Sequence, residues 1–147
     1  MIDAKDQLLL NLLLEHSRLS FRAVAQKAGM SVVSVIQRLR KLEQEGVIMN
    51  YSCRLNYEKL GYELTAIIQL RISKGKLFEV EQKIATHPNI IGVYDVTGNF
   101  DSLVIAKFRS RKSLDGFLKK IQTYDFVERT ETNIVLNTIM EKDIRLE

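Results

Sequence analysis

Six basic residues and no acidic residue lie between His16 and Lys41, which makes this stretch the most distinctive in the sequence. Serine, glutamine and valine side chains lie among the later basic residues. Arginine, glutamine and serine donate hydrogen bonds to base edges, valine contacts a thymine methyl group, and lysine pairs with phosphate. The six are Arg18, Arg22, Lys27, Arg38, Arg40 and Lys41. The stretch therefore has the residue types of a surface that binds a polyanion.

Two helices joined by a tight turn, over residues 19–42, are predicted to position these side chains. Ser20 and Ser31 are placed as N-caps, and Gly29 ends the first helix because glycine tolerates a left-handed backbone. Apolar residues recur three or four positions apart in the second helix and predict one buried stripe. The stripe is Val32, Val35, Ile36, Leu39 and Leu42, and the opposite face carries Val33, Ser34, Gln37, Arg38 and Lys41.

A basic, polar face on a helix–turn–helix predicts binding in the major groove of DNA. The residues assigned to base edges or nearby phosphates are Ser31, Val33, Ser34, Gln37 and Arg38, and those assigned to phosphates alone are Arg18, Arg22, Lys27 and Lys41. Arg38 is expected to bind a guanine edge and Gln37 an adenine. A solvated charged face is also the commonest kind of helix surface, so the pattern alone leaves that alternative open.

The composition describes a globular chain of one ordinary domain or two small ones. The 147 residues are 46% hydrophobic and carry a net charge of +4. The first 60 residues hold nine Lys/Arg against six Asp/Glu, so the polyanion-binding part is expected there.

A single cysteine, Cys53, excludes an intrachain disulfide. With no signal peptide and no apolar run approaching about 20 residues, we expect a cytoplasmic protein without a membrane partner.

The first half of the chain is predicted to form a helical domain followed by a strand. An initial helix, capped by Asp3, runs to about Glu15 with Leu8, Leu9, Leu12 and Leu13 inward. The alternation over 47–55 predicts a strand, and the polar segment 56–61 predicts a hinge. We therefore expect a winged-helix-like DNA-binding domain over 1–50 and a linker strand over 51–61.

The second half, residues 62–147, has the element order β-α-β-β-α-β. The predicted strands cover 64–73, 90–97, 102–109 and 127–140, and the predicted helices cover 76–86 and 113–124. This order is that of the ferredoxin-like fold, in which both helices cover one face of an antiparallel sheet. The fold class is thus α+β, and the other face of the sheet is expected to be buried by a second copy of the chain.

The chain resembles the Lrp/AsnC transcription regulators, also called feast/famine regulatory proteins, along almost its whole length. The motifs that carry the resemblance are Arg18-Leu19-Ser20, Gly29-Met30-Ser31, Leu42-Glu43-x-x-Gly46-Val47-Ile48 and Val96-Thr97-Gly98-Asn99-Phe100-Asp101. The resemblance implies a DNA-binding domain, a hinge strand, and a domain that dimerises and binds a small effector, typically an amino acid. It also implies assembly of dimers into tetramers or octamers. The family often has an acid where this chain has Asn99.

The Gly98–Asp101 turn is the expected effector site. Its backbone N–H groups are suited to a carboxylate, and Asp101 to an ammonium group. Thr130 and Thr132 lie two apart on one strand and are expected to line the same pocket across the dimer interface. The predicted set is Thr97, Gly98, Asn99, Phe100, Asp101, Thr130 and Thr132. A plain hairpin turn with solvent-facing threonines is the alternative.

Catalytic chemistry has no support in the sequence. His16 and His87 are far apart, Cys53 lies in a predicted strand, and neither a phosphate-binding loop nor metal-ligand spacing is present. We therefore expect a protein that is not an enzyme and has no cofactor. An architectural DNA-packaging protein without effector response remains the alternative function.

The phosphate contact assigned to Lys41 gives the first test. Replacing Lys41 by alanine should flatten the dependence of log K on log salt by about one charge, because one fewer counterion is released on binding. Fluorescence anisotropy on one duplex across a salt series measures this slope. A slope identical to that of the unmodified chain would remove Lys41 from the interface.

Overall fold

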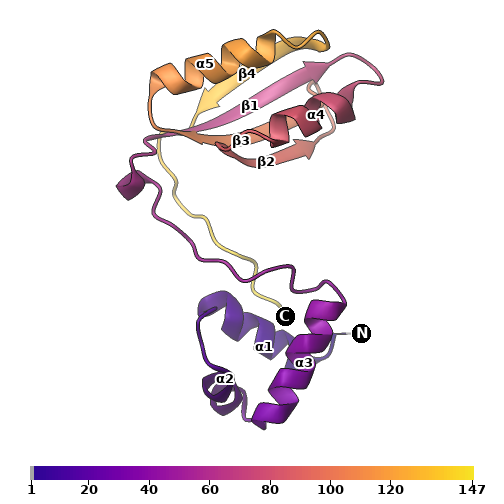
Figure 1. The fold of residues 1–147 in the computed structure, drawn as a ribbon, viewed down its shortest axis with the longest axis vertical. Coiled ribbons are helices and arrows are strands. Elements are labelled where there is room, and N and C mark those ends of the chain that lie inside the picture. The colour runs from indigo at the N-terminus through magenta and orange to yellow at the C-terminus, as the bar shows by residue number, and fades with distance from the viewer. Residues whose placement is uncertain (1) are drawn as a thin grey trace. The chain divides into compact units, whose positions relative to one another are not determined.

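The computed structural model describes residues 2–147, which form two compact units (Figure 1). The first unit comprises residues up to 55 together with 140–147, and the second comprises residues 56–139. The C-terminal segment joins the first unit because the Asn11 side chain donates to the Leu146 carbonyl and accepts from the Leu146 N–H, each over 2.9 Å. The predicted second domain, 62–147, includes this segment.

The first unit contains three helices, α1 (Ala4–Glu15), α2 (Phe21–Ala28) and α3 (Val32–Gln44). Ser20 Oγ accepts the Ala23 N–H and Ser31 Oγ accepts the Ser34 N–H, each over 3.2 Å, so both predicted caps are confirmed. Gly29 ends α2 in the left-handed conformation at φ 63°. The helix–turn–helix thus forms because local side-chain bonds replace the backbone partners that helix ends lack.

The three helices bury a small apolar core. Its buried members are Leu9, Leu10, Val24, Ala25, Val35, Leu39 and Leu42. The prediction that Leu8 points inward was wrong, since Leu8 is 41% exposed and Leu10 is buried. Val32, predicted in the stripe of α3, is also exposed because it lies in the first turn, beyond the reach of α1 and α2.

The second unit is a four-stranded antiparallel sheet with two helices. The strands are β1 (Leu64–Ile72), β2 (Ile90–Asp95), β3 (Ser102–Phe108) and β4 (Val127–Ile134), and the helices are α4 (Leu77–Ala85) and α5 (Arg111–Gln122). The sheet order β2-β3-β1-β4 and the antiparallel pairings are those of a ferredoxin-like fold. The predicted fold class is therefore confirmed.

One face of this sheet carries the core. Ala66, Ile68 and Leu70 of β1 are buried against Val80 and Ile84 of α4, and against the inward residues of α5, Leu114, Phe117 and Ile121. The alternate residues point to the other face, where no element of the described chain in this unit covers them. Ile67 and Gln69 lie there, paired with Ile105 and Leu103 of β3, and all four are only half-buried.

Two expected strand segments differ in the structure. Residues 47–55 form no strand, because they belong to the helical unit, where the described chain offers no strand edge for pairing. The last strand ends at Ile134 and not at Met140, because Ile134 pairs with Ala66 and the partner strand β1 begins at Leu64. Residues 58–60 form a short 3₁₀ helix in the predicted hinge.

Acid should weaken the first unit through Asp3. The hydrogen bond from the Asp6 N–H, and next the one from Arg38, lower the pKa of Asp3 below its ordinary 3.8. The ionised carboxylate therefore stabilises the fold above that value, and this contribution is lost as the pH falls through the lowered pKa.

The variant Asp3→Asn keeps an N-cap side chain but loses the charge. Its melting temperature should lie below that of the unmodified chain at pH 7, and the gap should close below pH 3.8. Circular dichroism melts over this pH range measure the difference. A gap that does not change with pH would contradict the role of the charge.

Candidate functional site

The face of α3 opposite the core presents polar and apolar side chains to solvent. Val33 is 64% exposed, and Gln37 is also exposed one turn later. Arg40 follows Gln37 by three positions and is exposed on the same side, with no ion pair among residues 2–147. Ser34 is half-buried beside them, and its N–H bonds to the cap Ser31. Val33, Ser34 and Gln37 of the predicted base-reading set lie on this surface, together with Arg40, which was not in that set.

Arg38 does not lie on that face. Its Nη1 donates to Asp3 Oδ2 and to Asp6 Oδ1, each over 2.7 Å. Asp6 is only 3% exposed, and its other oxygen accepts the Asp3 N–H over 3.1 Å. These hydrogen bonds raise the pKa of Arg38, and the one that Arg38 donates to Asp6 contributes most. The guanidinium predicted to bind guanine is therefore bound to the start of α1.

The helical spacing of Arg38 explains this position. Arg38 follows the buried Val35 by three residues and precedes the buried Leu42 by four, so it borders the core side of α3. Arg40 follows Val33 by seven residues, which places it on the exposed side. Arg40 was not among the residues predicted from the sequence to contact DNA, and its seven-residue spacing from Val33 is the signal that places it on the exposed side.

The residues predicted to contact phosphate lie before α2, in α2 and in α3. Arg18, Arg22, Lys27 and Lys41 are all exposed. Lys41 Nζ lies 3.8 Å from Glu45 Oε1, an exposed contact that contributes little to stability. Arg22 lies in the first turn of α2, next to the cap Ser20. All four cations are therefore accessible to a polyanion.

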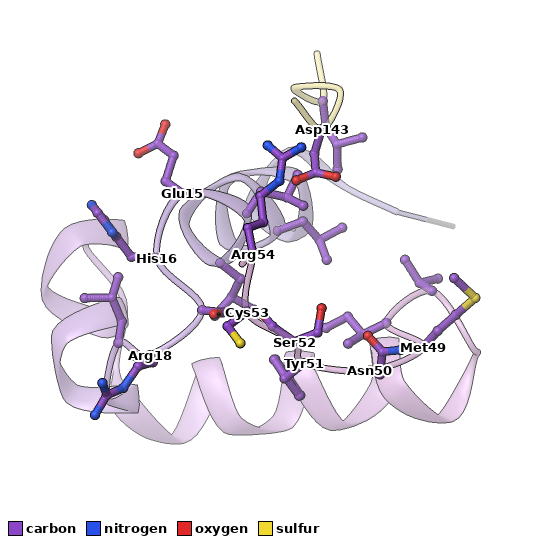
Figure 2. A pocket seen from close by; sticks show the side chains of 18 of the residues that line it. Glu15, His16, Arg18, Met49, Asn50, Tyr51, Ser52, Cys53, Arg54 and Asp143 are labelled. Atoms are coloured by element: carbon purple, nitrogen blue, oxygen red, sulfur yellow. Dashed lines mark hydrogen bonds between the residues drawn. The ribbon is translucent and has the colours of Figure 1, made fainter. Parts of the chain in front are cut away.

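A large apolar hollow of about 1150 Å³ lies elsewhere in the first unit, between α1 and residues 47–54 (Figure 2). Figure 2 shows Arg18, Cys53 and Arg54 among the residues around it. The Tyr51 hydroxyl at its border donates to Glu43 over 2.7 Å, and burial together with Glu43 raises the pKa of Tyr51 to about 12. Except for Arg18 and Lys27, its lining contains none of the predicted site residues.

The Gly98–Asp101 turn connects β2 to β3. Among residues 2–147, the N–H groups of Gly98, Asn99 and Phe100 find no hydrogen-bond acceptor, as an anion-binding turn requires. Asp101 Oδ2 accepts the Ile72 N–H over 2.8 Å, so one carboxylate oxygen is engaged by β1. Thr97, Gly98 and Asn99 are exposed and Phe100 is half-buried.

Thr130 and Thr132 lie on β4, which is separated from β3 by β1 in the sheet. They pair with Leu70 and Ile68, whose side chains face the helices, so both threonines also point to the helical side of the sheet. The Gln122 side chain of α5 donates to Thr130 Oγ1 over 3.4 Å. The turn, by contrast, contacts Arg71, whose Nη1 donates to the Asn99 carbonyl over 2.9 Å.

Comparison with protein families identifies both units. Residues 2–49 match the winged helix-turn-helix DNA-binding family, and residues 65–144 match the Lrp/AsnC ligand binding domain. The second match covers more than half of the chain. A DNA-binding helix–turn–helix combined with a ligand-binding domain defines the class of ligand-binding transcriptional regulators. None of the helices in residues 2–147 is long and apolar enough to cross a membrane.

Whole-chain relatives agree with this class. An HTH-type transcriptional regulator of Pyrococcus furiosus is 47% identical over 146 residues, which cover 99% of this chain and 98% of that protein. The HTH-type transcriptional regulator FL11 of Pyrococcus horikoshii is 31% identical over 95% of this chain and 93% of its own length. Each match covers nearly the full length of the relative.

Solved structures show the same fold. The structure of E. coli AsnC superimposes with a TM-score of 0.91 at 26% identity, covering 99% of each chain. The feast or famine regulatory protein of M. tuberculosis, complexed with L-methionine, has a TM-score of 0.86 at 28% identity over 96% of each chain. The chain belongs to the Lrp/AsnC family, so it is a DNA-binding transcriptional regulator with a ligand-binding domain and not an enzyme.

The turn geometry gives a test at Gly98. Its φ of 122° is one that side chains rarely adopt, although a Cβ added there would meet no atom within 4 Å. Gly98→Ala should therefore destabilise the chain by about 1–3 kcal/mol through backbone strain alone. The matched control is Gly116→Ala in α5, where φ is ordinary and space is open, so alanine should stabilise by about 0.5–1 kcal/mol.

Urea denaturation of both variants measures the two changes in the free energy of unfolding. Opposite signs are expected. If Gly98→Ala leaves the free energy of unfolding unchanged, the turn changes its conformation readily and is not a preformed site.

Proposed function

We propose that this regulator binds preferred sequences of duplex DNA as a dimer or larger assembly, with α3 in the major groove, and that an amino acid bound at the Gly98–Asp101 turn adjusts this binding. The observation that supports it most is the exposed face of α3, where Val33, Gln37 and Arg40 lie opposite the core. The action is expected in the cytoplasm.

Val33 and Gln37 are the proposed base readers. A valine methyl group suits the C5-methyl of thymine, and a glutamine amide suits the N6/N7 edge of adenine, with about 1–3 kcal/mol of discrimination for a good bidentate pair. Ser31 and Ser34 lie at the start of α3, where they would contact phosphate or a base edge once the helix lies in the groove. Arg40 takes the guanine or phosphate contact first expected from Arg38.

Arg38 acts in this proposal by positioning α3. A guanine contact would require the guanidinium to leave Asp3 and Asp6, and the nearly buried Asp6 carboxylate would then lack its partner. Leaving one member of a buried ion pair without its partner destabilises a protein by more than the intact pair stabilises it. Arg22, Arg18, Lys27 and Lys41 are the proposed phosphate contacts, and they fix the register of the helix on the duplex.

Dimerisation is supported by the uncovered face of the sheet. Ile67, Leu103 and Ile105 form an apolar centre there, and a second copy would bury it. One recognition helix reads few base pairs, whereas a two-fold dimer places two of them about 34 Å apart on a near-palindromic site. Two dimers would form the tetramer, and four dimers the octamer, that the family resemblance implies.

Effector binding is supported by the unpaired N–H groups of the turn. They suit an α-carboxylate, and the second oxygen of Asp101 suits an α-ammonium group. The M. tuberculosis regulator with bound L-methionine is a relative of the same fold. Since Thr130 and Thr132 point to the helical side, they would reach the ligand only through a rearrangement or from a partner subunit.

Sequence preference is tested by selecting duplexes from a random pool and comparing a selected duplex with a scrambled one. The unmodified chain should prefer the selected duplex by about 1,000-fold or more at moderate salt. Gln37→Ala should lose about 1–3 kcal/mol of discrimination at one base-pair position. Gln82→Ala, an exposed glutamine on α4 in the other unit, is the matched control and should leave binding unchanged.

Equal affinity for selected and scrambled duplexes would favour a packaging protein over a sequence-reading regulator. Sedimentation of the unliganded chain gives the oligomeric state. A lone subunit at concentrations that saturate the duplex would overturn the dimer.

A further inference from the structure

We propose that Arg71 and Arg129 form an anion subsite beside the Gly98–Asp101 turn, and that this subsite selects an amino acid whose side chain carries a carboxylate. The inference rests on the proposed binding of an amino acid at the turn and names the chemical class of that ligand. Neither arginine belongs to the set predicted from the sequence.

The sheet register places the two arginines directly opposite each other. Arg71 of β1 pairs with Arg129 of β4, so both side chains leave the sheet on the same side. This is the face not covered by helices, because the adjacent residues Leu70 and Ile72 are buried in the helical core. Like charges in directly opposed positions are destabilising, and an anion held between them would remove the repulsion.

Both guanidinium groups are directed to the turn. Arg71 Nη1 donates to the Asn99 carbonyl over 2.9 Å, and the Arg129 guanidinium carbon lies 5.6 Å from the centre of the Phe100 ring. The turn and the two cations therefore border one region. Both arginines are exposed, with 68% of the Arg129 side chain accessible, so their remaining donors are open to a ligand.

The acidic groups nearby neutralise this pair only in part. Glu131 Oε2 lies 3.6 Å from Arg129, a long contact between exposed side chains, and no carboxylate among residues 2–147 pairs with Arg71. Asp101 engages the Ile72 N–H through one oxygen. Glu128, next to Arg129, accepts a hydrogen bond from the Ser73 hydroxyl over 2.8 Å. An additional carboxylate is thus accommodated beside Arg71.

These groups match the three charges of an acidic amino acid. The α-carboxylate would accept from the turn N–H groups, the α-ammonium would donate to Asp101, and the side-chain carboxylate would accept from Arg71 and Arg129. Guanidinium groups bind carboxylates by paired, charge-assisted hydrogen bonds, which favour an acid over its amide. An uncharged side chain would leave Arg71 without a carboxylate and Arg129 with only its long contact to Glu131.

Calorimetric titration of the full chain with L-glutamate, L-aspartate, L-glutamine and L-asparagine tests the selection. Each acid should bind about tenfold more tightly than its own amide at low salt, and the ratio should shrink as salt screens the charges. Glutarate, which lacks the ammonium group, should bind more weakly than glutamate. Arg71→Met and Arg129→Met should each bring the acid-to-amide ratio close to one.

Arg111→Met is the matched control, because Arg111 is an exposed arginine at the start of α5, beyond the other end of β3. It should keep the full preference for acids, and melting curves verify that each variant is folded. Preference for an amide or an apolar amino acid would overturn the subsite but leave the amino-acid effector in place. If no amino acid binds while DNA binding persists, the effector part of the proposed function fails together with the subsite.

Discussion

The carboxylate of Asp6 is the constraint that organises the DNA-binding unit. It is almost completely buried, and a buried charge is tolerated only with a partner and satisfied hydrogen bonds. The Arg38 guanidinium and the Asp3 N–H supply them, which ties the middle of α3 to the first turn of α1. The face of α3 left exposed is thereby fixed as the one with Val33, Gln37 and Arg40, and this is the face that meets DNA in the proposed complex.

In the second unit, the two faces of the sheet have different surroundings. Its helices bury one side of the sheet and leave the other side apolar at its centre, with a pair of opposed arginines and a turn of unpaired N–H groups at one end. An apolar centre favours association of chains, and a polar end favours a small charged ligand. In a regulator, both events on one face provide a way for the ligand to change the assembly and so the affinity for DNA.

Periodicity predicted the helices, the strands of the sheet and the ferredoxin-like order. Capping residues predicted the ends of α2 and the start of α3, because Ser20, Gly29 and Ser31 act locally. Predictions that depended on tertiary partners were less accurate. The segment 47–55 alternates like a strand but has no edge to pair with, and the directions of Thr130 and Thr132 follow from a register that a single strand does not reveal. The hydrogen bonds of Arg38 to Asp3 and Asp6 could not be predicted, because these acidic partners lie more than thirty positions earlier in the sequence.

A structure of the full chain bound to a selected duplex is the most direct test of the proposed DNA-binding face. It should show Val33, Gln37 and Arg40 at base edges or phosphates of the major groove, while Arg38 keeps its hydrogen bonds to Asp3 and Asp6. An Arg38 guanidinium inserted between the bases with Asp6 left unpaired, or a duplex bound to a surface that excludes α3, would contradict it.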